Sequence, residues 1–175
     1  MTQCAASPPL PADALTQPHW SGWGLDLDNT HFQPADRAGL TAADLGNLEL
    51  KWALGYAGAT TVTTQPAVAG GRIYALDART GCAHWKFDTA DAVRGAIVIT
   101  ELDDGRFVLL AGDRKAWFYA VDANSGELVW KDKVDDHDWA LVTGSPKIYN
   151  DRVYVGVASF EELAGGSVTY ECCTF

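Results

Sequence analysis

Short apolar, β-rich runs alternate with turn residues along most of the chain, and this order predicts strands joined by hairpins. Asp104–Gly112 and Asn150–Gly156 each begin with a turn and continue as a β-rich run. Gln65–Val68 and Gly144–Tyr149 are expected to be first strands, because each has Pro near its entrance, where a missing N–H is tolerated. Glu49–Trp52 is expected to be a lone outer strand. The pattern therefore predicts an all-β fold.

One segment occurs twice. Tyr74–Trp85 (YALDARTGCAHW) matches Tyr119–Trp130 (YAVDANSGELVW) at an offset of 45 residues. In both copies a strand ends in Asp, which can cap a turn, and Gly follows four residues later, where the chain needs a positive φ. The next strand runs to Trp, a large apolar residue suited to filling space between repeated units. Because a period of about 40–45 residues is typical of four-stranded blades, the repeat predicts a β-propeller with Trp between its blades.

The repeat is irregular in one place. Trp52 and Trp85 are 33 residues apart, whereas Trp85 and Trp130 are 45 apart. The shortening falls near Gly71–Tyr74, and we predict either a blade that lacks about one strand and turn or a sequence lesion. The chain also stops at Phe175, inside its third unit. Since at least about four blades close a propeller, we expect a partial propeller of about three to four blades, belonging to a larger protein.

The formal net charge of −10 argues against nucleic acid as a partner, because phosphate binding needs a basic surface. It argues equally against an anionic membrane surface. A neutral or cationic partner fits this charge, and a solvated acidic surface explains it as well. No run of about 18 apolar residues occurs, so no membrane span is predicted.

Residues 1–18 are expected to form a flexible lead-in, because they are rich in Pro and small residues. The composition changes at His19 to aromatic residues and Gly, so we predict a lead-in, 1–18, followed by a partial propeller domain, 19–175. The lead-in has no basic segment followed by an apolar one, so no signal peptide is predicted in this chain.

The chain has four cysteines and no C-x-x-C motif, which excludes a zinc ribbon or covalent haem within it. Cys4 and Cys82 could pair, but sequence cannot fix connectivity, and Cys82 as a small strand residue is the simpler interpretation. Cys172 and Cys173 are adjacent. Their Cα atoms would lie about 3.8 Å apart, below the usual disulfide range, so a bond between them would be strained. Strain of this kind is kept mainly at functional sites, and such a bond would indicate an oxidising compartment.

Three further blocks complete the pattern. Residues 20–34 read WSGWGLDLDNTHFQP, residues 45–52 read LGNLELKW and residues 170–175 read YECCTF. Together with the two Trp repeats they resemble the pyrroloquinoline quinone (PQQ) dehydrogenases, most closely their polyvinyl alcohol dehydrogenase-like branch. The resemblance covers roughly residues 19–175. The Trp repeat alone is moderately specific, because non-enzymatic propellers share it, whereas the first block together with Cys-Cys-Thr-Phe is far more specific.

The resemblance implies that the chain is the N-terminal part of an eight-bladed propeller with Ca²⁺-bound PQQ on its axis. It implies oxidation of an alcohol in the periplasm, with electrons passed to a cytochrome c, and haem only in a missing domain or partner. The base of the family is an Asp expected in a later blade, so no catalytic residue is assigned in this chain, which we expect to be inactive alone. Two features depart from the family: the shortened unit, and His31 where Arg is common.

Four candidate site residues follow from the resemblance at the end of the chain. It implies a vicinal disulfide between Cys172 and Cys173, lying flat against the PQQ ring; the alternative is two reduced or mispaired thiols. Glu162, and second to it Glu161, would bind Ca²⁺, since a hard cation prefers carboxylate oxygens. The alternative for both is a solvated acidic loop.

Three further candidates lie earlier in the chain. Arg94, followed by Gly, resembles the Arg that contacts the PQQ carboxylates, and a guanidinium suits a tricarboxylate. The alternative is a surface Arg. Thr143 and Ser145 could donate hydrogen bonds to the cofactor, or could serve the turn at a strand entrance. Asp135–Asp138 could suggest a metal site, but a hydrophilic loop between blades is the better interpretation, because sequence neighbours rarely face one centre.

Two other functions stay open at this stage. The first is a non-enzymatic propeller, such as an outer-membrane assembly scaffold, which shares the Trp repeats but does not need the Cys-Cys pair. The second is a nonfunctional truncated product, whose exposed blade edges would favour aggregation.

Overall fold

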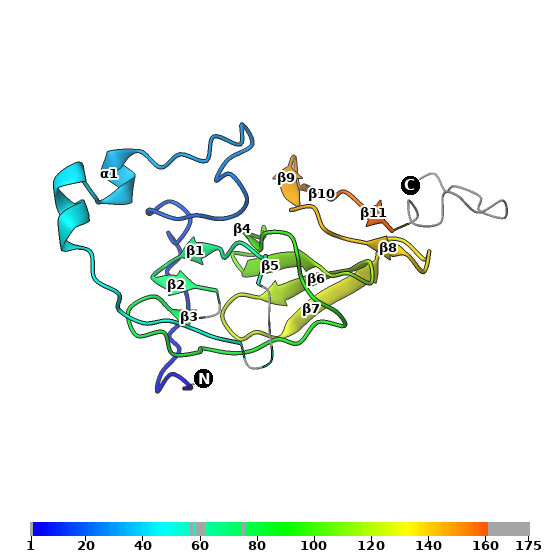
Figure 1. Ribbon diagram of the computed structural model, residues 1–175. Helices are drawn as coiled ribbons and strands as arrows, with labels where there is room; N and C mark the ends of the chain where they lie inside the picture. The colour runs from blue at the N-terminus through cyan, green and yellow to red at the C-terminus, as the bar shows by residue number, and fades with distance from the viewer. Residues whose placement is uncertain (1, 57, 59–61, 75, 161–175) are drawn as a thin grey trace.

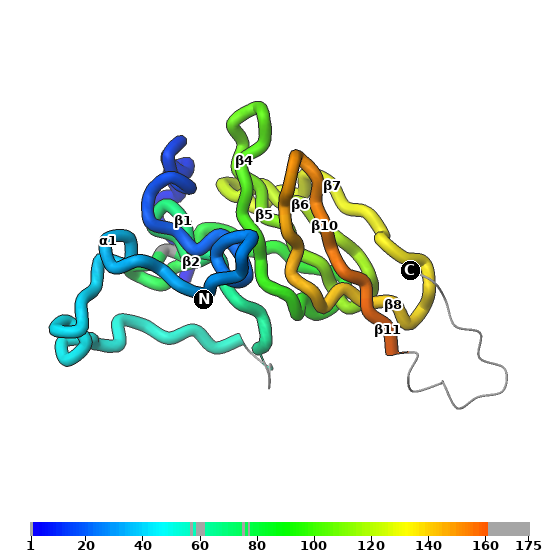
Figure 2. The backbone as a smooth tube through the Cα atoms, turned by 90° about the horizontal axis from the view of Figure 1, so that it is seen from above, coloured from blue at the N-terminus to red at the C-terminus, as the bar shows by residue number. Residues whose placement is uncertain are grey.

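The computed structural model describes residues 2–56, 58, 62–74 and 76–160. Within them the chain forms three successive antiparallel sets of strands, which follow one another in chain order from left to right in Figure 2. The predicted all-β character is therefore confirmed for the body of the chain, while the number of blades stays a prediction.

The central sheet is complete and has the order β4-β5-β6-β7. Its strands are β4 (Val98–Glu101), β5 (Phe107–Gly112), β6 (Trp117–Asp122) and β7 (Leu128–Lys133). The first turn contains Gly105 with φ +81°, a conformation that favours glycine. At the end of β6 an Asp carboxylate accepts the N–H groups of two residues that follow it. This is the Asp-capped turn that the repeat predicts.

The first sheet is a shortened version of the central sheet (Figure 1). It consists of β1 (Val68–Ala69), β2 (Arg72–Ile73) and β3 (Leu76–Asp77), extended by single bridges to Trp20 on one side and Ala83 on the other. The β2–β3 hairpin closes after two residue pairs, whereas the β5–β6 hairpin has five. The shortening is as predicted, and it is spread over the sheet: three strands of two residues each are present, and a single bridge to Ala83 stands where the central sheet has its fourth strand.

The third set is one long hairpin with an irregularity in its middle. Its outer end pairs β9 (Lys147–Tyr149) with β10 (Arg152–Tyr154), and its base pairs β8 (Ala140–Leu141) with β11 (Ala158–Ser159). The turn at Asn150–Asp151 has positive φ at both residues, 47° and 58°, as expected for a two-residue hairpin turn.

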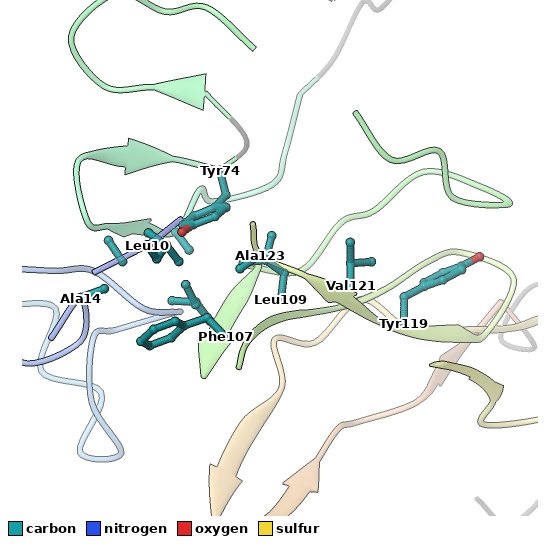
Figure 3. Packing of buried hydrophobic residues seen from close by; sticks show 11 residues of the cluster. Leu10, Ala14, Tyr74, Phe107, Leu109, Tyr119, Val121 and Ala123 are labelled. Atoms are coloured by element: carbon teal, nitrogen blue, oxygen red, sulfur yellow. The ribbon is translucent and has the colours of Figure 1, made fainter. Parts of the chain in front are cut away.

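The two faces of the central sheet carry separate hydrophobic clusters, because alternate residues of a strand point to opposite sides. One cluster lies toward the first sheet and the N-terminus, as Figure 3 shows, and its members are Leu10, Ala14, Ala67, Ala69, Tyr74, Ile99, Phe107, Leu109, Tyr119, Val121 and Ala123. The other lies toward the third hairpin and is formed by Val98, Val108, Leu110, Phe118 and Ala120, with Ile148 and Val155 packed against it. Strands β4 to β6 are thus covered on both faces, whereas β7 is mostly exposed.

Tryptophans connect each repeated unit to the next. The indole Nε1 of Trp85 donates to the carbonyl of Ala123 at 3.2 Å, and a Cβ atom at Gly126 would lie 2.6 Å from the indole. Trp52 makes the same two contacts with Ala78 and Gly81 in the unit that follows it, again with a 3.2 Å hydrogen bond. Packing of these two tryptophans between units is therefore confirmed. The glycine is required both for its positive φ and for the closeness of the ring.

Residues 2–18, hereafter the N-terminal arm, are not the flexible lead-in that their composition predicts. Cys4 forms a disulfide with Cys82, with Cα atoms 5.1 Å apart, and its N–H donates to the carbonyl of Ala83. Leu10 and Ala14 are buried in the first cluster. The simpler interpretation of Cys82 as an unpaired strand residue is corrected as well. Pro-rich sequence indicates a lack of regular structure, and here that irregular segment is anchored by side chains.

A helical segment precedes the first sheet and lies to the left of it in Figure 1. It contains α1 (Ala35–Ala38) and the 3₁₀ helix η1 (Ala42–Asn47), whose Asp44 carboxylate accepts the N–H and the hydroxyl of Thr41. The predicted outer strand Glu49–Trp52 is wrong, because the structure assigns no strand there. Neither helix of the described chain has the length and hydrophobicity needed to span a bilayer.

Candidate functional site

Arg94 lies in the segment that leads into β4, and its side chain is exposed. The next residue, Gly95, is buried, and a Cβ atom there would lie 2.5 Å from the carbonyl oxygen of Gly144. Only a glycine lets the two backbones approach so closely. The Arg94 segment is therefore held against the turn that carries Thr143 and Ser145.

Ser145 makes a second connection between these two segments. Its hydroxyl oxygen accepts a hydrogen bond from the N–H of Ala96 at 2.7 Å. One lone pair is used in this way, while the O–H can still donate. Thr143 is half-buried two residues earlier. The structure thus brings the three described candidates, Arg94, Thr143 and Ser145, onto two segments in direct contact.

A third strand entrance lies beside them. The hydroxyl of Thr64 donates to the carbonyl of Val93 at 2.7 Å, and the N–H of Ile97 donates to the carbonyl of Gln65 at 3.3 Å. Two of these segments lead into β1 and β4, the first strands of their sets, and the third joins β8 to β9. The candidate site is therefore a meeting point of three segments that enter strands, which places loop side chains on a rigid support.

Asp113, in the turn between β5 and β6, connects the Arg94 segment with the segment of Thr143. It is fully buried, and its carboxylate accepts the N–H of Asp91 and the O–H of Tyr119. Its carbonyl accepts the N–H of Val142 at 2.9 Å. Burial, helped by the carboxylate beside its hydroxyl, raises the pKa of Tyr119 to about 12, so Tyr119 stays a neutral donor.

The donors at this meeting point suit an anion with several oxygens. A guanidinium presents five N–H groups in one plane and binds carboxylates in a bidentate manner. The hydroxyls of Thr143 and Ser145 add single donors that can reach carbonyl or carboxylate oxygens. The donor set of the described residues thus fits the carboxylates and quinone oxygens of PQQ.

The remaining candidates lie outside the described residues. They are Glu161, Glu162, Cys172 and Cys173. Their assignments to Ca²⁺ and to a vicinal disulfide therefore stay predictions. The disulfide that the structure does contain joins Cys4 to Cys82 and is not vicinal.

Asp135–Asp138 lies in the loop between β7 and β8, where it was expected. Its first carboxylate accepts the N–H of His137 at 2.7 Å and so closes a local turn. In the part of the chain that the structure describes, no three His, Cys, Asp or Glu side chains form a group that could hold a metal ion.

Two surface hollows, of about 330 and 370 Å³, share Leu25 and Asp26 in their walls. The ammonium of Lys147 donates to the carbonyls of Trp23 at 2.6 Å and of Asp26 at 2.8 Å, which attaches this loop to β9. Hydrogen bonds from Thr30 to the Asp26 carboxylate lower the pKa of that carboxyl. The first hollow is also lined by β4 and by Pro146, next to Ser145, whereas Arg94 lines neither hollow.

Sequence reasoning missed Asp113 and Lys147. An Asp directly after the β-rich run of residues 107–112 is a signal for a capped turn, and it could have suggested the role of Asp113 within that turn. Its partners Asp91 and Val142 are distant in sequence. Lys147 gives no such signal, because its partners are backbone carbonyls more than 100 residues away.

Comparisons with known proteins identify the repeat family of the chain. A profile of PQQ-type repeats, described as outer membrane protein assembly factor BamB, matches residues 22–169. A crystal structure of BamB from Moraxella catarrhalis covers 57% of this chain and 44% of its own, with 20% identity and a TM-score of 0.27, a similarity too low to establish how the sheets are arranged.

Several enzymes are similar in sequence. Polyvinylalcohol dehydrogenase of a Pseudomonas species is 35% identical over 94% of this chain, and the enzyme of Sphingopyxis sp. strain 113P3 is 35% identical over 99%. Quinoprotein alcohol dehydrogenase PedH of Pseudomonas putida is 26% identical over 79%. The chain spans only 27%, 28% and 26% of the lengths of these relatives. Because the repeat profile matches most of the chain, this protein belongs to the PQQ-type β-propeller family.

Proposed function

We propose that this chain is part of a PQQ- and Ca²⁺-dependent dehydrogenase that oxidises alcohols of the polyvinyl alcohol type and passes electrons to a cytochrome c. The observation that carries the proposal is 35% identity to two polyvinylalcohol dehydrogenases across 94% and 99% of the chain. The contact between the Arg94 segment and the turn of Thr143 and Ser145 supports it, because three suitable donors lie on neighbouring backbones.

The role of this chain is to bind and orient. PQQ, when bound, supplies the two-electron acceptor that no amino-acid side chain provides. The Arg94 guanidinium binds one of its carboxylates, and the hydroxyls of Thr143 and Ser145 donate to its oxygens. Glu162, with Glu161 as the second choice, supplies carboxylate oxygens to Ca²⁺. Cys172 and Cys173, joined as the resemblance implies in a vicinal disulfide, would contact the ring.

The disulfide between Cys4 and Cys82 supports a compartment outside the reducing cytosol. This agrees with the proposed periplasmic location, because structural disulfides persist in oxidising environments.

Binding of PQQ tests the proposal directly. We expect PQQ with Ca²⁺ to quench the Trp fluorescence of the chain in a saturable manner. Replacing Arg94→Ala should weaken binding by roughly tenfold or more, because a charge-assisted hydrogen bond is lost. Arg152→Ala, which removes an exposed charge from β10, is the matched control and should bind like the wild type. Equal affinity of the two variants would contradict the assigned site.

A second candidate is a non-enzymatic scaffold, favoured by the BamB description of the matching profile. A scaffold needs no cofactor, so its Trp fluorescence should not respond to PQQ at any Ca²⁺ concentration. A saturable response that Arg94→Ala weakens would exclude this candidate.

A further inference from the structure

We propose that Asp113 is the positioning residue of the candidate site and fixes both of its segments at once, so that Arg94 is presented in a binding geometry before a ligand arrives. The effect on ligand binding rests on the proposed function, whereas the effect on the Arg94 segment does not.

The Asp113 carboxylate has four donors. Oδ1 accepts the N–H groups of Lys115 at 2.8 Å and Trp117 at 3.1 Å, which closes its own turn. Oδ2 accepts the hydroxyl of Tyr119 at 2.7 Å and the N–H of Asp91 at 3.2 Å. A simple turn needs only the two hydrogen bonds to Oδ1. The second oxygen therefore serves the loop that leads to Arg94.

The backbone of the same turn holds both segments. Asp113 forms a bridge with Val93, and the N–H of Arg114 donates to the carbonyl of Ala92 at 3.1 Å. The carbonyl of Asp113 accepts the N–H of Val142, the residue before Thr143. Asp113 and Arg114 thus hold the backbone just before Arg94 and just before Thr143.

Close packing strengthens this connection. Gly112 precedes Asp113, and a Cβ atom there would lie 2.3 Å from Cγ1 of Val142. Tyr119 adds a further link, since its hydroxyl accepts the N–H of Ala90 at 3.0 Å while donating to Asp113. The Arg94 segment is therefore held at residues 90, 91, 92 and 93 by one hairpin turn.

A fixed backbone below an exposed side chain is the arrangement expected of a ligand anchor. Arg94 is exposed, so its guanidinium is available, while its flanking peptides are immobilised. Immobilisation before binding removes part of the entropy that binding would otherwise cost. A carboxylate is required at position 113, because an amide would present N–H groups to donors on one side.

The test uses three single variants of the full chain, Asp113→Asn, Tyr119→Phe and Arg94→Ala. A double variant combines Asp113→Asn with Arg94→Ala. The matched control is Asp122→Asn, which makes the same change at the turn between β6 and β7 of the central sheet. Amide hydrogen exchange of residues 90–95 is measured first, without ligand. We expect Asp113→Asn to accelerate it roughly 10- to 100-fold, Tyr119→Phe to accelerate it less, and Asp122→Asn to leave it unchanged.

PQQ affinity is measured next by Trp fluorescence. Asp113→Asn should raise the Kd roughly tenfold in the wild-type background and have no further effect when Arg94 is already Ala, because it acts through that residue. Unchanged exchange in both Asp113→Asn and Tyr119→Phe would overturn the inference, as would additive losses of affinity in the double variant. A wild-type chain that does not bind PQQ would overturn the proposed function, and exchange would still decide the positioning role.

Discussion

The first sheet and the central sheet contain the same repeated segment but differ in one hairpin. Tyr74 and Tyr119 are equivalent in the repeat, and they lie apart in the first cluster (Figure 3). In the central sheet, Tyr119 donates to Asp113 in the β5–β6 turn. The sequence has no Asp between β2 and β3, and the hydroxyl of Tyr74 is buried without a hydrogen-bond partner among the described residues.

The comparison shows what the longer hairpin contributes. Its turn gives a buried hydroxyl a partner and holds the Arg94 segment and Val142, whereas the shortened sheet is supported from outside. There the guanidinium of Arg72 donates to the carbonyls of Pro8 and Ala123, and Asn124 accepts the N–H of Leu10. The N-terminal arm thus replaces part of the support that the longer hairpin provides elsewhere.

The largest expected effect concerns the disulfide that anchors the N-terminal arm. Replacing Cys4 and Cys82 together by Ser should destabilise the chain by about 2–4 kcal/mol, because the disulfide closes a long loop in the unfolded state. Urea unfolding of the double variant, and of the wild type with and without a reductant, measures this difference. If reduction leaves the unfolding midpoint unchanged, the arm does not support the first sheet through its disulfide.

The next effect concerns the contact between a Trp ring and a glycine, which both sheets share. Gly126→Ala and Gly81→Ala should each cost about 2–3 kcal/mol, because the new methyl group meets a Trp ring and the positive φ becomes strained. Gly105→Ala is the matched control, since it has the same type of φ but open space around it, and should cost about 1 kcal/mol. Thermal unfolding compares the three. Equal losses at Gly105 and Gly126 would show that ring packing contributes little.

A smaller effect concerns the tyrosine hydroxyl, which has hydrogen-bond partners in the central sheet but not in the first sheet among the described residues. Tyr119→Phe should cost about 1–2 kcal/mol, because a buried carboxylate oxygen and the N–H of Ala90 each lose a partner. Tyr74→Phe should be neutral or stabilise the chain by up to about 1 kcal/mol, because it removes a buried hydroxyl without a partner. A clear loss of stability in Tyr74→Phe, measured by urea unfolding, would contradict the comparison.

The smallest effect is a dependence on alkaline pH. Burial raises the pKa of Tyr119 to about 12 and raises that of Tyr74 in the same direction, whereas an unfolded Tyr titrates near pH 10. The contribution of these tyrosines to the free energy of unfolding is therefore fully present below about pH 10. It is lost as the pH rises toward 12, because the tyrosines of the unfolded chain release their protons first. Unfolding followed by circular dichroism between these pH values should have a shallower slope in Tyr119→Phe and in Tyr74→Phe. Slopes equal to that of the wild type would mean that neither hydroxyl is held neutral by the fold.

Much of the repeated body could be predicted from the sequence, because its signals are local. The Asp-turn-Gly segment and its Trp predicted the β6–β7 turn and the packing between units. The N-terminal arm could not be predicted, since its Pro-rich composition describes only the local backbone, and its order comes from Cys82 and Arg72, far along the chain. The role of Asp113 was missed for the same reason, because turn chemistry is local but its contact with Asp91 depends on tertiary packing.

The contact between each Trp and the glycine of the following unit also sets an order of events during synthesis. Trp52 precedes Gly81 by 29 residues, and Trp85 precedes Gly126 by 41. At about 5–20 residues per second, roughly one to eight seconds pass between the synthesis of each Trp and that of the glycine that packs against its ring. A large apolar ring exposed for that time is a target for chaperones and for neighbouring nascent chains. The speed of translation between a Trp and its glycine should therefore influence the yield of folded protein.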